Sequence, residues 1–179
     1  MKPLLTLADY QRAAQTLGCE VAAIMAVAFV ESSGNGFDSA GRIKKRFEPA
    51  WFKRLSGKTA STYEQAYTID KINAMMSTSW GKFQIMGFNH KIAAYATVEA
   101  MVAAFDKSEV AQLNGFIGFI KSKKLEDELR TKNWKAFAYT YNGSDYARLG
   151  YHTKMAEAYE DFKADPTVVD LKKKEPSTP

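Results

Sequence analysis

Apolar residues recur at helical spacing along most of the chain, and short polar or glycine-containing segments separate these stretches. Gly18 and Gly143 follow two of them, at the position where glycine commonly ends a helix. Ser108 and Asn133 precede two others, where a polar side chain can cap the first turn. We therefore expect helices at residues 6–17, 20–30, 50–55, 63–75, 98–107, 108–122, 125–130, 134–141 and 151–163.

One segment has the period of a strand instead. Between the turn residues 37–41 and Pro49, apolar and polar side chains alternate, which predicts a small β-hairpin. Its second strand would carry Glu48 on one face with Arg42, Lys44 and Arg46. The predicted fold class is mainly α (α+β): a helical domain with a small β-hairpin.

The stretch Ala22–Val30 is uncharged and runs directly into Glu31. A helix that is apolar on all faces is buried, so the carboxyl group would lie at the edge of an apolar wall, beside the flexible segment 32–36. Desolvation there is expected to raise the pKa of Glu31, which suits a general acid. A helix-end glutamate paired with a lysine or arginine is an equally open interpretation.

The surroundings expected for Glu48 differ from those of Glu31. The cations next to Glu48 favour its ionised carboxylate. Two carboxyl groups in contrasting environments are typical of the acid and base of a glycosidase. The alternative is a surface salt bridge on an exposed ribbon.

Three further side chains are candidates for binding. Gln84 lies among apolar neighbours between Gly81 and Gly87, so its amide either finds partners or faces a cleft, where it would bind sugar hydroxyls. Tyr141 and Asn142 are polar groups at the end of a predicted helix. Each also has a structural interpretation. Gln84 could lie on the solvent-exposed side of a short helix, Tyr141 could be an aromatic residue at the edge of the core, and Asn142 could cap a helix.

Composition narrows the class of protein. With 179 residues, 46% of them hydrophobic, the chain suits one globular domain. The net charge of +5 favours acidic partners such as nucleic acid, anionic membrane or bacterial cell wall, but the basic residues are scattered and a nucleic-acid interface would cluster them.

A single cysteine, Cys19, excludes an internal disulfide and forms no metal cluster with His90 and His152. The apolar run 22–30 is too short to span a bilayer and is not a secretory signal.

Three separated segments together resemble the signature of the lysozyme-like superfamily: Glu31-Ser32 after an apolar helix, residues 81–86 (GKFQIM) and residues 138–143 (AYTYNG). The fuller pattern over residues 15–163 resembles the N-acetylmuramidase catalytic domain of phage endolysins. The resemblance implies a lysozyme-like muramidase domain at 1–164, followed by a Lys/Pro-rich tail at 165–179.

By that resemblance the substrate is peptidoglycan, and the β-1,4 bond between N-acetylmuramic acid and N-acetylglucosamine is hydrolysed. Glu31 would be the general acid and Glu48 the second carboxylate, while Ser79, Gln84, Tyr141 and Asn142 would hold the sugars. No metal or organic cofactor is needed. We expect a monomer without nucleic-acid partners or stable membrane insertion.

The resemblance further implies a phage or prophage lysis enzyme, made in the bacterial cytoplasm, which reaches the wall in the periplasm through a separate membrane-opening factor. Two alternatives stay open. A lytic transglycosylase shares the same three segments but forms 1,6-anhydro products without water. A non-catalytic wall-binding module would keep the fold without the chemistry.

Overall fold

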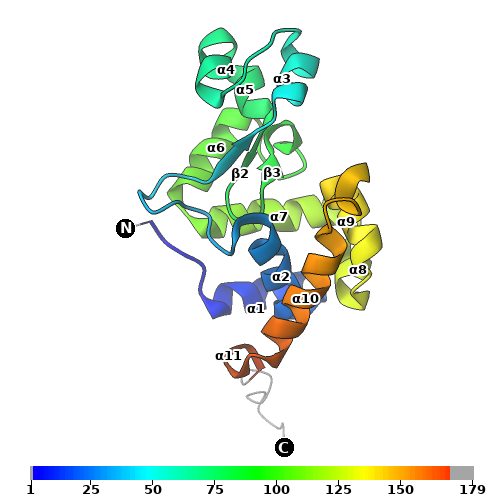
Figure 1. Ribbon diagram of the computed structural model, residues 1–179. Helices are drawn as coiled ribbons and strands as arrows, with labels where there is room; N and C mark the ends of the chain where they lie inside the picture. Colours follow the sequence, from blue (N-terminus) through cyan, green and yellow to red (C-terminus); the bar gives the residue numbers. More distant parts are fainter. Residues whose placement is uncertain (1, 170–179) are drawn as a thin grey trace, which may run out of the picture. The chain divides into compact units, whose positions relative to one another are not determined.

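The computed structural model describes residues 2–169, and these residues divide into two compact units (Figure 1). The first unit comprises the N-terminal residues up to Leu5 and Glu31–Lys123, and the second comprises Thr6–Val30 and the residues from Lys124 onward. A single catalytic domain over 1–164 therefore stays a prediction. The predicted tail begins with a short helix, α11 (Pro166–Val169), and its residues 170–179 lie outside the described part.

The second unit is helical. Leu17, Ile24, Leu129, Phe137 and Met155 are buried in its elements. Trp134 contacts the ring of Tyr159, with centroids 5.8 Å apart. Its elements are α1 (Leu7–Leu17), α2 (Val21–Ser32) as far as Val30, α8 (Glu126–Thr131), α9 (Trp134–Asn142), the 3-10 turn η2 (Ser144–Tyr146), α10 (Tyr151–Ala164) and α11.

Helix α1 is capped at both ends by residues that are typical of helix ends. Thr6 and Asp9 form a capping box in which each side chain accepts a hydrogen bond from the other's backbone N–H. Gly18 ends the helix in the left-handed conformation, with φ at 64°. Local chemistry therefore determines both ends of this helix.

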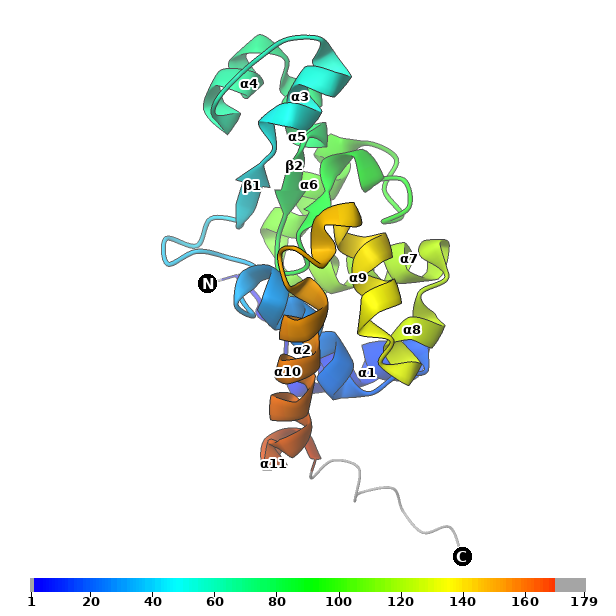
Figure 2. The same ribbon diagram turned by 45° about the vertical axis from the view of Figure 1, so that its right-hand side comes forward.

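The first unit contains a three-stranded antiparallel sheet in the order β1-β2-β3. Arg46 of β1 (Lys45–Phe47) pairs with Ser79 of β2 (Thr78–Trp80), and Ser79 pairs with Met86 of β3 (Ile85–Met86). Figures 1 and 2 both show α3, α4 and α5 together beyond one end of the strands, and α7 at the other end. The remaining elements are α3 (Pro49–Ser56), α4 (Tyr63–Ile69), α5 (Lys71–Met76), the 3-10 turn η1 (Gly87–Asn89), α6 (Val98–Lys107) and α7 (Glu109–Lys123).

The mainly helical fold class is confirmed, and three details differ from the predicted elements. The segment after Glu31 forms only a short hairpin, closed by the Phe37–Ile43 bridge. The hairpin is short because the residues that follow it form β1 and pair with β2. Glu48 stands at the N-cap position of α3, one residue beyond β1. The predicted helix 63–75 breaks at Asp70, whose extended backbone and side chain cap α5.

Aromatic packing forms the centre of the first unit. Phe83, which directly precedes Gln84, stacks on Phe116 of α7 with ring centroids 4.3 Å apart. Phe105 and Met101 of α6 are fully buried in the same unit.

Among the described residues no single helix has the length and apolarity to cross a bilayer, although α1 and α2, bent by 111°, satisfy those criteria as a pair.

Candidate functional site

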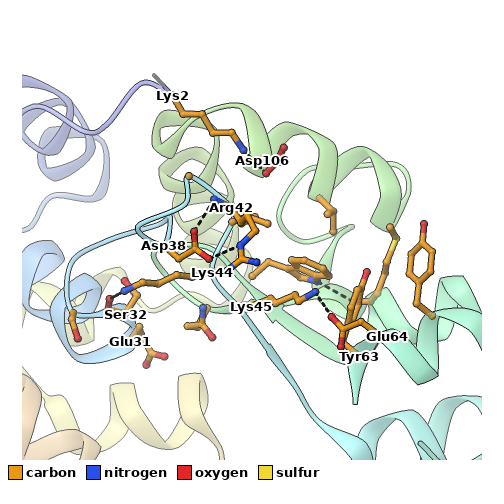
Figure 3. Close-up of a pocket in the computed structure, with 18 of the residues that line it drawn as sticks. Lys2, Glu31, Ser32, Asp38, Arg42, Lys44, Lys45, Tyr63, Glu64 and Asp106 are labelled. Atoms are coloured by element: carbon orange, nitrogen blue, oxygen red, sulfur yellow. Dashed lines mark hydrogen bonds and ion pairs between the residues drawn. The ribbon is translucent and has the colours of Figure 1, made fainter. Parts of the chain in front are cut away.

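A cavity of about 1210 Å³ lies within the first unit. Glu31 and Ser32 line it at one side, and Tyr63 and Glu64 line it at the other, with Lys44 and Lys45 between them (Figure 3). This volume exceeds the roughly 300–1,000 Å³ of a pocket for one drug-sized ligand. The cavity therefore suits an extended or oligomeric molecule.

Glu31 reaches the cavity because α2 ends there. The helix is uncharged from Val21 to Val30, and six of its residues are almost completely buried, although Phe29 is half exposed and packs edge-on against Phe162. The ammonium of Lys44 donates to the carbonyl oxygen of Ser32 at 2.6 Å, which stabilises the negative end of the helix. Lys44 also lines the cavity, so a cation lies close to the carboxyl-bearing helix end.

Gln84 lines the same cavity in a constrained conformation. Its φ of 48° lies in the left-handed region, which is uncommon for a residue other than glycine. Its amide nitrogen donates to the carbonyl oxygen of Gly81 at 2.8 Å, and its amide oxygen lies 2.9 Å from the hydroxyl of Ser79. Ser79 is buried and is not among the described cavity-lining residues; its hydroxyl contacts the amide oxygen of Gln84 and the carbonyl oxygen of Arg46.

Glu48 is likewise outside the described lining of the cavity. Its carboxylate accepts a hydrogen bond from Arg46 Nε at 2.8 Å, and its side chain is 34% exposed. Its backbone N–H donates to Ser77, next to the strand that carries Ser79. Glu48 therefore adjoins the small sheet that also positions Gln84.

Asp38 is a carboxylate of the cavity wall that the sequence analysis did not single out. It accepts hydrogen bonds from the backbone N–H groups of Ala40 and Arg42 and from Arg42 Nε, each between 2.8 and 2.9 Å. The backbone donor of Arg42 is the main cause that lowers the pKa of Asp38. Asp38 thus closes the hairpin turn with an ionised carboxylate whose oxygens already have partners.

Two buried residues of α7 connect the loop that follows Glu31 with the loop that carries Gln84. Glu109 accepts from the backbone N–H of Gly36 at 2.6 Å and pairs with the ammonium of Lys82 at 2.7 Å. Gln112 accepts from the backbone N–H of Lys82 at 2.6 Å and donates to the carbonyl of Phe105 at 2.8 Å. We refer to Lys82, Glu109 and Gln112 as the α7 anchor.

Glycine is required where the loops meet this anchor. A Cβ added at Gly36 or at Gly81 would overlap the side chain of Gln112. The glycines in the loop after Glu31 and in the loop before Gln84 therefore allow both backbones to approach one buried amide.

Tyr141 and Asn142 belong to the second unit, at the C-terminal end of α9. Tyr141 stacks on Phe137 with ring centroids 5.2 Å apart, and its side chain is partly buried. The roles of Tyr141 and Asn142 in sugar binding stay predictions.

The surroundings of Cys19 and His90 indicate structural roles for both side chains. Burial raises the pKa of the Cys19 thiol to about 12, so the thiol is not a nucleophile at neutral pH. His90 is buried, and its Nδ1 lies 3.0 Å from the carbonyl oxygen of Tyr95. Among the described residues no group of three or more His, Cys, Asp and Glu side chains is arranged to hold a metal ion.

Comparison with known proteins defines the class. The fold is similar to the crystal structure of the Burkholderia AP3 phage endolysin, with a TM-score of 0.75 and 36% sequence identity, over 89% of this chain and 70% of that one. Together with the lysozyme-like fold, this similarity identifies a peptidoglycan hydrolase of the endolysin type.

The family follows from the sequence match. Residues 20–62 and 58–163 match the model of the N-acetylmuramidase family, so the chain belongs to that family. No curated protein sequence matches the chain.

Proposed function

We propose that the chain hydrolyses the β-1,4 bond between N-acetylmuramic acid and N-acetylglucosamine, with Glu31 as the general acid that protonates the glycosidic oxygen. The observation that carries the proposal is the position of Glu31, which ends an apolar helix at the wall of a cavity large enough for several sugars. Aromatic rings and an amide share that wall with charged side chains, as expected for a site that binds polar sugar rings.

Glu48 is the proposed second carboxylate, acting as the base that activates or orients water. The comparison with Asp38 supports this role. Asp38 accepts three hydrogen bonds, which lower its basicity and fix it in the turn, whereas Glu48 accepts from Arg46 at the end of a short strand. If Glu48 acts through water, its carboxyl group lies about 6.5–9.5 Å from that of Glu31 in the substrate complex.

Gln84 is proposed to hold a sugar, with Ser79 acting on it indirectly. The Ser79 hydroxyl and the Gly81 carbonyl fix the amide of Gln84, which reduces the freedom it would lose on binding. Tyr141 and Asn142 are assigned to sugar binding on the strength of the family motif at 138–143.

The biological role proposed is host lysis by a phage or prophage. The family and the endolysin similarity support synthesis in the bacterial cytoplasm and action on the cell wall. A separate membrane-opening factor would then bring enzyme and wall together.

Mass spectrometry of the muropeptides released from purified sacculi tests the reaction. Hydrolysis adds one water to each cleaved bond, so the products carry reducing ends. A lytic transglycosylase would release 1,6-anhydro products instead, lighter by one water, and their predominance would contradict the proposal.

A further inference from the structure

The cavity continues well beyond the carboxyl group of Glu31. Its far part is formed by α4 and the adjoining strand, where Lys45, Tyr63, Glu64, Tyr67 and Thr68 line it. Figure 3 shows Tyr63 and Glu64 at the side opposite Glu31 and Ser32. We call these five residues the α4 arm of the cavity.

The two tyrosines of the α4 arm differ in what their rings contact. The ring of Tyr63 lies 5.5 Å from that of Trp80, edge to face, and the ammonium of Lys45 lies 3.9 Å above it. Tyr67 stands one helical turn further along, with its ring centroid 5.6 Å from that of Tyr63, and is 39% exposed. Tyr63 thus supports the wall, while Tyr67 presents ring surface to the cavity.

Next to these rings is an exposed ion pair. Lys45 Nζ lies 3.0 Å from Glu64 Oε1, and the two side chains are 36% and 74% exposed. An exposed pair of this kind adds little to stability. It does offer ammonium donors and carboxylate acceptors together, beside an aromatic face.

We propose that the α4 arm is a remote subsite that binds an uncharged N-acetylhexosamine of the glycan strand, away from the bond that is cleaved. The charges of Lys45 and Glu64 cancel within the arm, and a sugar would present hydroxyls to this pair and C–H groups to Tyr67, whose ring centroid also lies 6.0 Å from the ammonium of Lys71. The inference rests on the proposed function, because it requires a glycan strand in this cavity.

A length series of peptide-free glycan strands tests the subsite. Tyr67→Ala is expected to lower kcat/KM on long strands by about threefold to tenfold, the effect of one aromatic contact, and to leave the shortest cleaved fragment unaffected. Tyr67→Phe keeps the ring and should retain most of the activity on long strands. Ile69→Ala, on the same helix but outside the cavity lining, is the matched control, since Ile69 is also exposed.

The binding step is measured separately with strands added to the inactive Glu31→Gln chain, with and without Tyr67→Ala. A several-fold weaker affinity for long strands supports the subsite. Equal losses on short and long strands, or no loss on either, would overturn it while leaving the assignment of Glu31 intact. Failure of the parental protein to cleave any peptide-free strand would instead overturn the proposed function and this inference with it.

Discussion

Asp38 and Glu48 carry the same charge but differ in how the surrounding structure uses their oxygens. Asp38 accepts two backbone hydrogen bonds and one from Arg42, and these bonds hold a turn. Glu48 has an ion pair with Arg46, on a side chain that is one-third exposed. At the scale of single residues, hydrogen bonding separates a structural carboxylate from a candidate base.

Replacing each carboxylate by its amide tests that distinction. We expect Glu48→Gln to lower kcat by about 100-fold, the lower end of the usual contribution of a general base. Asp38→Asn should lower kcat less than about tenfold, because general-base catalysis, typically worth at least 10²-fold, would be retained. The check is steady-state kinetics on soluble glycan fragments. Full activity of Glu48→Gln together with inactive Asp38→Asn would show that the two roles are exchanged.

The sequence allowed Glu31 to be singled out because it directly follows a long uncharged run, and Gln84 because it lies between apolar neighbours. Asp38, Tyr63 and Tyr67 had no such signal. A carboxylate in a turn and tyrosines at helical spacing look the same whether they line a cavity or not, and their position depends on the pairing of β1 with β2, far apart in the chain.

At the scale of elements, hydrophobic periodicity predicts the burial of the apolar residues of α7 but not that of its polar residues. Of its predicted apolar stripe, Leu113, Phe116 and Ile120 are buried, and Val110 and Ile117 are partly buried. Glu109 and Gln112 of the same helix are also buried, at 1% and 0% exposure. Their burial could not be predicted, because the partners that satisfy them, Gly36 and Lys82, come from distant loops.

The α7 anchor is expected to position the loop that follows Glu31 and the loop that carries Gln84. Gln112→Met should cost about 2 kcal/mol of unfolding free energy, because it leaves the Lys82 N–H and the Phe105 carbonyl without their partner. Below the unfolding transition, kcat should still fall more than about tenfold, since small displacements of catalytic groups are costly.

Ile120→Val is the control for stability alone. Ile120 is fully buried in the same helix, and its shortening costs about 1 kcal/mol without touching a polar contact. Its kcat should stay near the parental value. Equal kcat values for the Gln112→Met and Ile120→Val chains would mean that the anchor contributes stability only.

The N-terminus of α1 gives a pH-dependent prediction. The Thr6 hydroxyl, foremost among several causes, lowers the pKa of Asp9, so the ionised carboxylate stabilises the folded state. This stabilisation is present above the unfolded pKa of about 3.9 and is lost as the pH falls through the lower folded value. Asp9→Ala should therefore cost about 1 kcal/mol at pH 7, and the difference should narrow below about pH 4. Urea unfolding at pH 7 and pH 3 measures it, and a pH-independent difference would contradict the cap assignment.

At the scale of the whole molecule, the net charge of +5 acts on encounter with the wall. Cell-wall polymers carry carboxylates and phosphates, and salt screens their attraction to a basic protein. We expect binding of the Glu31→Gln chain to sacculi to weaken several-fold between about 0.05 M and about 0.5 M salt. Cleavage of short soluble glycan fragments by the parental chain should depend less on salt over the same range, because they carry fewer charges than the wall. Salt-independent binding in a pelleting assay would show that net charge plays no part.

The most direct test of the central claim is the rate at which the Glu31→Gln chain releases new reducing ends from purified sacculi, compared with the parental chain. The side chains are nearly equal in size, so the variant should unfold at the same temperature. Its rate should be lower by at least about 100-fold, because the proton donor is gone. A folded variant that releases reducing ends at the parental rate would contradict the account.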